Sequence, residues 1–378
     1  MLQTPVYIID EKALIRNLEI LGRVEKESGA HILLAQKAFS AFCVYPLIAK
    51  YISGVTASGL FEARLGAEEF RKENHVFSPA FSDPEMEELV QICDHISFNS
   101  LAQLEHHRPV WEKAQKEHDL GIGIRVNPEH STQDAHAIYD PCASGSRLGV
   151  RLCDMPDELP WGVDGLHFHT LCEQGFKPLL ETFRVFEEKF QKYLMSGQIH
   201  WLNLGGGHHI TREGYDVEGL ISLVKEIRDK YKVTVYLEPG EAIALDAGDL
   251  DTTVMDIVNT DGLPVLILDA SAACHMPDVL EMPYRPPLDG SGEIGEKAFG
   301  YRLSSRTCLA GDVIGDYSFD KEIRIGDRLT FKDMSIYSMV KNNTFNGMPL
   351  PDIALRHADG SEEVIRSFGY LDFKNRLS

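Results

Sequence analysis

Short apolar segments alternate with helical stretches along the first two thirds of the chain. The apolar segments are rich in β-branched and aromatic residues, which is the pattern of buried strands. Eight of them occur, at residues 31–36, 54–58, 75–80, 95–99, 121–127, 165–170, 200–205 and 234–239. The stretches between them, such as 85–93 and 183–194, read as helices. Eight strands with intervening helices predict an α/β fold whose main domain is a closed parallel (β/α)8 barrel of the TIM type.

A helix is predicted before the first barrel strand. Asp10 is a suitable N-cap residue, and the pattern ends at Ser28 and Gly29. Apolar residues recur between these positions at helical spacing, namely Leu14, Leu18, Leu21 and Val24.

Beyond residue 241 the helical period disappears and strand-like segments take over. They lie at 252–260, 264–271 and 322–332, the last with a Gly-Asp turn. We expect a second, β-rich domain here, and we expect the N-terminal segment TPVYIID to join its sheet. The predicted barrel domain therefore covers 11–241, and the β-rich domain covers 1–10 and 242–378.

The charge of the chain limits its partners. It has 58 acidic and 37 basic residues, and its net charge of −21 repels phosphate backbones and anionic lipid. We therefore expect neither nucleic acid nor a membrane surface as a partner. The acidity would attract a polycation to a cleft, although it also serves solubility alone.

The cysteines and the N-terminus predict a cytoplasmic protein. Seven cysteines are an odd number, and they lack C-x-x-C spacing, so a reducing compartment fits better than a disulfide framework. The first residues, MLQTPVYIIDEKAL, lack the features of a secretion signal, and no segment is apolar for long enough to span a bilayer.

Polar residues gather where the predicted barrel strands end. In such barrels the chemistry takes place at the C-terminal ends of the strands and in the loops that follow. The residues at these positions are Lys37, Ser58, Asn127, His169, Gly205, Gly206, Gly207 and Glu238. Their placement around one ring predicts a shared site.

Lys37 is an unusual charge, because it follows directly after an apolar strand in LLAQKAF. Burial in a barrel mouth lowers the pKa of an amine, and only a neutral amine attacks an aldehyde. Lys37 is therefore a candidate for covalent attachment of an aldehyde cofactor. The alternative is a lysine whose stem covers apolar surface while its ammonium group stays in water.

The segment LNLGGGHHI places three glycines after a strand, where backbone N–H groups can point at a bound anion. It is not the nucleotide-binding P-loop pattern. His169 could stack on a planar cofactor, and Glu238 in YLEPG could keep a ring nitrogen protonated. His167 and His169 are two apart and could instead bind metal, but no further ligand completes such a site, and we expect no metal.

These motifs, together with CLAGD at 308–312 and the segment YSMVKNNTFNG, resemble one family over almost the whole chain. It is the fold III, alanine racemase-like family of pyridoxal-phosphate-dependent decarboxylases, which includes the ornithine, diaminopimelate and carboxynorspermidine decarboxylases. Read from spacing alone, Cys308 and Asp312 could equally be an acid with its charged neighbour or an ordinary core pair.

The resemblance implies roles for individual residues. Lys37 would carry pyridoxal 5'-phosphate, His169 would stack on its ring, and Glu238 would face its nitrogen. The family pattern adds residues that would hold the phosphate or line the cofactor, namely Gly205, Gly206, Gly207, Tyr337, Ser58 and Arg147. Cys308, as the proton donor in catalysis, and Asp312 would enter the active site of the neighbouring subunit. The protein would then be a head-to-tail homodimer with shared sites.

Two departures from the wider family point to the substrate. Relatives that read EPGR have an arginine where this chain has Glu241, and SAACHMPD places Asp278 near the expected substrate end. Two separated carboxylates suit the ammonium groups of a long polycation. EPGEA, SAACHMPD and CLAGD most resemble the carboxynorspermidine decarboxylases, whose relatives also accept carboxyspermidine.

The resemblance leaves other substrates and one non-catalytic function open. The alternative substrates are diaminopimelate, ornithine and arginine. A non-catalytic carrier of pyridoxal phosphate has the same barrel, but it lacks a β-rich domain.

Overall fold

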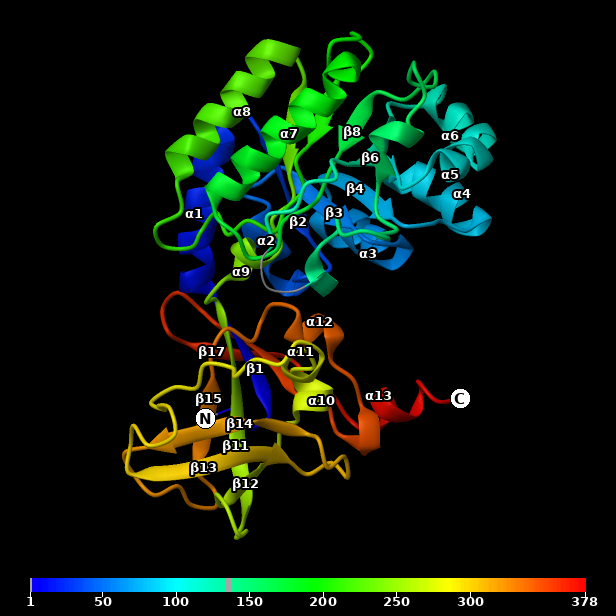
Figure 1. Ribbon diagram of the computed structural model, residues 1–378. Helices are drawn as coiled ribbons and strands as arrows, with labels where there is room; N and C mark the ends of the chain where they lie inside the picture. The colour runs from blue at the N-terminus through cyan, green and yellow to red at the C-terminus, as the bar shows by residue number, and fades with distance from the viewer. Residues whose placement is uncertain (1, 134–136) are drawn as a thin grey trace. The chain divides into compact units, whose positions relative to one another are not determined.

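The structure, a computed structural model, describes residues 2–133 and 137–378. It divides into two compact units, one of residues 17–243 and the other of residues 1–16 with 244–378. The first unit contains the predicted barrel and the second contains the predicted sheet (Figure 1).

The barrel is closed and parallel, as the sequence predicts. Its strands pair in the order β2-β3-β4-β5-β6-β8-β9-β10, and β10 pairs with β2 to complete the ring. The eight strands are β2 (His31–Ala35), β3 (Gly54–Ala57), β4 (Glu73–Ser78), β5 (His95–Phe98), β6 (Gly121–Asn127), β8 (Gly165–His167), β9 (Trp201–Asn203) and β10 (Thr234–Leu237). A two-residue strand, β7 (Val150–Arg151), adds to β6. All seven residues of β6 are buried, as expected of a strand covered on both faces.

Helices surround this ring in the first unit (Figure 1). They are α2 (Tyr45–Ile48), α3 (Leu60–Leu65), α4 (Asp83–Ile92), α5 (Leu101–His106), α6 (Arg108–Gln115), α7 (Phe176–Leu194), α8 (Val217–Tyr231) and α9 (Glu241–Ala244). They are amphipathic where they are long: one stripe of α7 is fully buried while the opposite stripe is charged.

The predicted N-terminal helix is confirmed as α1 (Glu11–Ser28). The side chain of Asp10 accepts a hydrogen bond from the Ala13 N–H at 2.8 Å, which satisfies a free donor of the first turn. Gly29 follows with φ of 72°, a conformation that favours glycine. The four apolar residues of the predicted stripe, Leu14, Leu18, Leu21 and Val24, are all 0% exposed.

The second unit is built on a mixed sheet in the order β14-β13-β12-β11-β1-β16-β17, with β15 paired to β11. Its strands are β1 (Val6–Asp10), β11 (Gly248–Val258), β12 (Val265–Leu268), β13 (Phe299–Ser305), β14 (Val313–Phe319), β15 (Arg328–Phe331), β16 (Asp352–Arg356) and β17 (Glu362–Arg366). Its helices are short: α10 (Ala272–His275), α11 (Asp278–Glu281), α12 (Ser338–Lys341) and α13 (Tyr370–Lys374). The N-terminal strand β1 lies between β11 and β16, so the prediction that it joins this sheet is confirmed.

No helix in the described part of the chain is both long and apolar enough to cross a membrane.

Candidate active site

A cavity opens at the C-terminal ends of the barrel strands. Four residues predicted from the sequence, Lys37, Ser58, His169 and Glu238, lie together in its wall. The complete lining is Ala35, Lys37, Thr56, Ala57, Ser58, Phe77, Arg125, His167, His169 and Glu238. Because these residues come from strands far apart in the sequence, closure of the barrel brings them together.

Lys37 lies in the cavity wall, and its side chain is accessible to solvent there. Insertion of the amine among the barrel walls lowers its pKa, and the positive charge of Arg125 lowers it further. Glu238 and Glu62 act in the opposite direction without reversing the shift. The side chain is thus both reachable and more readily neutral than a surface lysine, which is what reaction with an aldehyde needs.

Arg125 is a buried cation beneath this site. Its guanidinium lies 4.4 Å from the ring centre of Phe77, and it donates a hydrogen bond of 2.9 Å to the backbone oxygen of His169. Burial lowers the pKa of Arg125 to about 10, so the side chain stays charged at neutral pH. A fixed positive charge therefore faces the Lys37 amine.

Glu238 stays ionised in the cavity wall. Burial on its own would raise its pKa, but His167, Asn203 and His169 outweigh burial and hold the pKa below its usual range. The Asn203 amide donates to Oε1 at 2.8 Å, and His167 Nε2 lies 3.4 Å from Oε2. Burial lowers the pKa of His167, while the neighbouring Glu238 carboxylate raises it. The site therefore holds a carboxylate that can accept a hydrogen bond from a ring N–H.

The three glycines form a tight turn after β9. Gly205 and Gly207 have φ of 69° and 83°, and a Cβ atom on Gly206 would lie 2.0 Å from the Glu238 carbonyl oxygen. Close approach to the protein's own backbone therefore requires glycine here.

The N–H groups of this turn are partly engaged within the protein. Gly205 N–H donates to Asn203 Oδ1 at 2.8 Å, and Gly206 N–H donates to His169 Nδ1 at 3.0 Å. Burial lowers the pKa of His169, so it is a neutral imidazole whose Nδ1 is an acceptor. The turn thus orients His169 and Asn203, and the contact of the three glycines with a phosphate group stays a prediction.

Of the two further residues predicted to line the cofactor, Ser58 and Arg147, only Ser58 lies in the cavity wall. Ser58 lines the cavity, and its backbone N–H donates to Glu62 at 2.6 Å. Arg147 is exposed and is not part of the cavity wall, although its charge acts on the nearby Arg125. The arginine that lines the cavity is Arg125, which the sequence prediction did not include.

In the β-rich unit, Asp312 is a hub of hydrogen bonds. It is 1% exposed, and its two oxygens accept from three hydroxyl groups and one backbone N–H. The donors are Ser271 Oγ at 2.7 Å, Ser305 Oγ at 2.5 Å, Thr307 Oγ1 at 2.5 Å and Ala273 N at 3.2 Å. All three hydroxyls reach Oδ2, whereas Oδ1 accepts only the Ala273 N–H, so direct binding of substrate by Asp312 stays a prediction. Asp312 fixes the loop that carries Cys308.

Cys308 and the segment after Tyr337 meet in the same unit. The Cys308 thiol is exposed, and its backbone N–H donates to Asn346 Oδ1 at 2.6 Å. Tyr337 has φ of 55°, a strained conformation for a non-glycine residue that often occurs at functional sites. Two predicted motifs that are far apart in the sequence therefore form one surface.

The two carboxylates predicted to bind a polycation already have partners. Glu241 accepts from the buried ring of His209, with Nε2 and Oε2 2.8 Å apart. Asp278 and Glu281 form ion pairs with Lys341. Glu241 therefore keeps its second oxygen for a further donor. An ammonium group that binds Asp278 would share this carboxylate with Lys341.

Comparison with known proteins identifies the family. Residues 6–335 match the family described as pyridoxal-dependent decarboxylase, C-terminal sheet domain. The chain is 42% identical to a carboxynorspermidine/carboxyspermidine decarboxylase from Campylobacter jejuni, over 99% of this chain and 98% of that protein. This chain belongs to the pyridoxal-dependent decarboxylase family.

A second relative and a solved structure are also similar to this decarboxylase over almost the whole chain. A carboxyaminopropylagmatine decarboxylase from Synechocystis is 41% identical over the whole of this chain and 96% of its own length. The crystal structure of the carboxynorspermidine decarboxylase from Campylobacter jejuni complexed with norspermidine superimposes with a TM-score of 0.91 at 41% identity, and the match covers 99% of this chain and all of that one.

Sequence reasoning missed part of the decarboxylase site. Arg125, Phe77 and Asn203 were not singled out, and His167 was considered only as a metal ligand. The charge in the otherwise apolar segment GIGIRVN was the available signal, because a buried strand tolerates an arginine only where that side chain has partners.

Proposed function

We propose that this decarboxylase removes carbon dioxide from carboxynorspermidine and carboxyspermidine, forming norspermidine and spermidine, with pyridoxal 5'-phosphate attached to Lys37. The observation that carries the proposal is the full-length identity of 42% to a protein of that activity, joined to a cavity whose residues suit the cofactor. We further propose that the enzyme works in the cytoplasm.

The cavity fits the cofactor in three respects. Lys37 is reachable and has a lowered pKa, Glu238 is ionised, and His169 is a neutral ring in the cavity wall. When bound, pyridoxal phosphate supplies an electron-withdrawing ring that weakens the bond between Cα and the carboxylate of an attached amino acid. Glu238 would accept a hydrogen bond from the ring nitrogen and favour its protonated state.

The remaining residues of the barrel would prepare the lysine and the ring. Burial and the charge of Arg125 lower the pKa of the Lys37 amine, which favours the neutral form that would bind and release the cofactor. The bond from Gly206 to Nδ1 fixes the His169 ring, and we assign His169 to stacking on the cofactor. Ser58 and Gly207 would contact the cofactor's polar groups.

The β-rich unit would supply the proton. We propose that Cys308 of a neighbouring subunit donates a proton to Cα after carbon dioxide has left, and that Tyr337 contacts the cofactor. This requires a head-to-tail homodimer with shared sites. The exposed thiol and the hydrogen bonds that hold its loop through Asp312 support this role.

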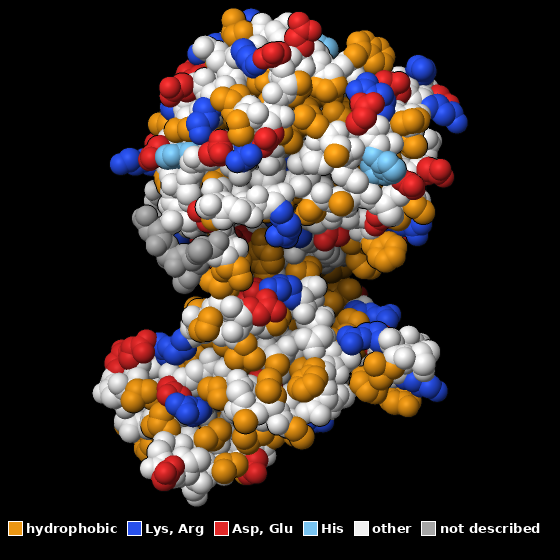
Figure 2. Space-filling view, turned by 45° about the vertical axis from the view of Figure 1, so that its right-hand side comes forward, with side chains coloured by type: hydrophobic (Ala, Val, Ile, Leu, Met, Phe, Trp, Pro, Cys, Tyr) orange, Lys and Arg blue, Asp and Glu red, His pale blue; other side chains and the backbone are white. Residues whose placement is uncertain are grey.

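Glu241 and Asp278 would bind the ammonium groups of the substrate. On the face in Figure 2, acidic and basic side chains are interspersed rather than gathered in one patch. The net charge of −21 is therefore a weaker argument for a cationic substrate than these two carboxylates are.

A second substrate deserves a direct test because of the relative from Synechocystis. That relative is a carboxyaminopropylagmatine decarboxylase, and it is as similar to this chain as the proteins from Campylobacter jejuni are. Both substrates are carboxylated polycations, so the cavity residues described above suit either.

The test is a comparison of kcat/KM across a panel of acids with the purified, cofactor-loaded enzyme. Carbon dioxide release is followed with carboxynorspermidine, carboxyspermidine, carboxyaminopropylagmatine, diaminopimelate, ornithine and arginine. We expect the first two to be the best substrates and the Lys37→Ala variant to lose both activity and the absorbance of lysine-bound cofactor. A preference for carboxyaminopropylagmatine would reassign the substrate, and an active Lys37→Ala variant would overturn the proposal as a whole.

A further inference from the structure

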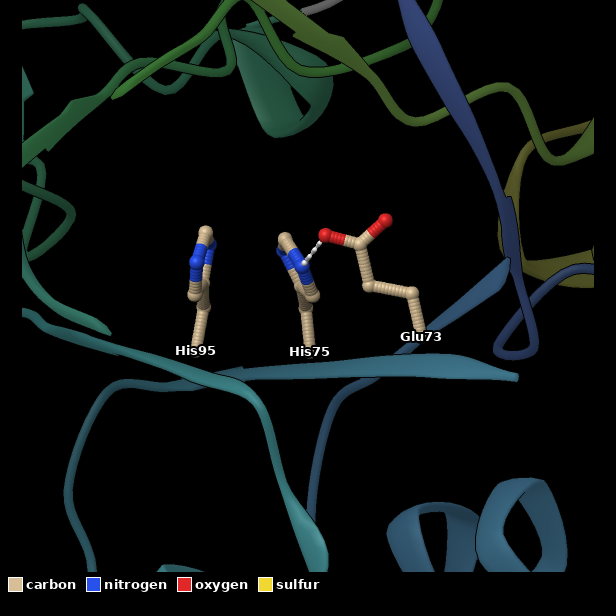
Figure 3. Close-up of side chains that lie close together, drawn as sticks. All are labelled: Glu73, His75 and His95. Atoms are coloured by element: carbon tan, nitrogen blue, oxygen red, sulfur yellow. Dashed lines mark hydrogen bonds and ion pairs between the residues drawn. The ribbon is translucent and has the colours of Figure 1, made fainter. Parts of the chain in front are cut away.

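A second cluster of polar side chains lies inside the barrel at the N-terminal ends of the strands, the end opposite the cavity. Glu73 is the first residue of β4 and His75 the third, so both side chains point to the same face. His95, the first residue of β5, is paired directly with His75 across the sheet. Figure 3 shows the three side chains rising side by side from these two strands.

The three side chains are close enough to share one ion. One ligand atom from each of Glu73, His75 and His95 lies within 4.8 Å of the others. His75 Nε2 is 3.1 Å from Glu73 Oε1, the contact drawn in Figure 3. Ligand bonds of about 2.0–2.2 Å would require these atoms to move closer together around the ion.

The carboxylate of Glu73 is already oriented by outer partners. His31 Nδ1 is 2.9 Å from Oε2, and the Tyr236 hydroxyl donates to Oε1 at 2.6 Å. Such outer hydrogen bonds are typical of metal sites, where they fix the ligating carboxylate.

His95 has a buried nitrogen without a partner. Its Nδ1 is shielded from solvent and makes no hydrogen bond. The ring is stacked on Trp201, with centroids 4.6 Å apart, and a Cβ atom on Gly121 would lie only 2.4 Å from it. The barrel therefore makes room for an imidazole whose polar atom is left unsatisfied, and a buried polar atom of this kind calls for a ligand.

We propose that Glu73, His75 and His95 bind one divalent transition-metal ion, with Zn²⁺ as the first candidate. Two imidazoles and one carboxylate are a common donor set for zinc and also for non-haem iron. The rings of Tyr236 and Trp201 pack against the two histidines, with the centroids of His75 and Tyr236 4.6 Å apart. The ion is therefore structural: it ties β4 to β5 and, through the Tyr236 hydroxyl, to β10.

The experiment measures metal binding to the cofactor-loaded enzyme after treatment with a chelator. Co²⁺ is titrated while its visible absorbance is recorded, Zn²⁺ is then added as a competitor, and thermal unfolding is measured with and without Zn²⁺. We expect one ion per chain, a spectrum of nitrogen and oxygen ligands without a thiolate charge-transfer band, and a higher unfolding temperature with Zn²⁺.

Variants locate the ion. His95→Phe keeps an aromatic ring on Trp201, and Glu73→Gln keeps the size of the side chain; each should weaken binding by more than about 100-fold, because each removes a direct ligand. Tyr236→Phe should weaken it by about 10–100-fold. The matched control is His106→Ala, in a second cluster of one carboxylate and two histidines (Asp83, His106 and His107) where His106 and Asp83 are exposed, and it should bind Co²⁺ as the parent does.

Several results would overturn this proposal without touching the proposed decarboxylation. They are the absence of Co²⁺ and Zn²⁺ binding by the parent, undiminished binding by Glu73→Gln, loss of binding by His106→Ala, or a thiolate band. Retained absorbance of the bound cofactor shows that a variant is folded, and Glu73→Gln decides the question if His95→Phe does not fold.

Discussion

Replacement of Glu238 by glutamine isolates the charge that is proposed to govern the cofactor ring. The amide has nearly the same size as the carboxylate, and its oxygen can still accept the 2.8 Å hydrogen bond from Asn203. Because the pKa of Glu238 is held below its usual range, the parent carries a full negative charge at neutral pH. Glu238→Gln therefore removes charge while it changes packing little.

The size of the effect follows from the hydrogen bond that is weakened. A hydrogen bond to an ionised group contributes about 1.5–3 kcal/mol, against about 0.5–1.5 kcal/mol for a neutral pair. The difference of about 1–2 kcal/mol corresponds to a roughly 5–30-fold lower kcat, since about 1.4 kcal/mol is a factor of ten.

The assay is carbon dioxide release at saturating substrate, with cofactor content checked by absorbance. Glu62→Gln is the matched control: this carboxylate also acts on Lys37, but it accepts the Ser58 N–H and does not line the cavity. A Glu238→Gln enzyme with the parent's kcat, or a larger loss in Glu62→Gln, would refute the role given to Glu238.

Three further changes test other parts of the structure. Gly207→Ala should destabilise the protein by at least about 2 kcal/mol in thermal unfolding, because φ is 83° and the new Cβ would lie 1.8 Å from a backbone oxygen. Asp312→Ala should cost about 2–4 kcal/mol in unfolding and also lower kcat, because buried donors lose their acceptor and the Cys308 loop is released. Arg125→Gln should raise the pKa of Lys37, so the rise of cofactor-loading rate with pH, followed by stopped-flow absorbance, should move to higher pH.

The first two of these changes have a control variant within the chain. Gly214 also has positive φ, of 80°, but nothing lies near its absent Cβ, so Gly214→Ala should cost only about 1–2 kcal/mol. Asp316 forms an accessible ion pair with Arg302, and Asp316→Asn should cost about 1 kcal/mol or less. An equal loss of stability in Gly207→Ala and Gly214→Ala, or in Asp312→Ala and Asp316→Asn, would contradict the role given to Gly207 or Asp312. A cofactor-loading rate whose pH dependence does not move in Arg125→Gln would contradict the role given to Arg125.

The barrel was predictable because its signal is local. Strands such as β6 are buried along their whole length, so each one is an apolar segment that can be recognised without knowing its neighbours. The position of Lys37 at a strand end was visible for the same reason. Strand β13 was not predicted, because only Phe299, Tyr301 and Leu303 in it are apolar and it includes a glycine, so its partners β12 and β14 are needed to recognise it.

Arg125 was not predicted because its role depends on which way one strand faces. In GIGIRVN the alternation between the two faces is hidden, since both faces are apolar. Only closure of the barrel shows that this side chain points toward Phe77 and the backbone of His169. The charge that lowers the pKa of Lys37 therefore could be found in the sequence as an anomaly, but not assigned.

Asp312 shows why a motif does not by itself distinguish a ligand from a support. The spacing C-x-x-x-D is the same whether the carboxylate faces a substrate or faces its own protein. Pairing of β12 with β13 brings Ser305 beside Leu268, and this register places the Ser271 hydroxyl within 2.7 Å of Asp312. Three hydroxyls, including that of Thr307 next to Cys308, donate to its Oδ2, so the carboxylate holds the loop of Cys308 in place. Exposure separates the two carboxylates: Asp312 is 1% exposed, whereas the Glu241 side chain is 16% exposed and only its Oε2 faces His209, so Glu241 remains the better candidate to meet an ammonium group.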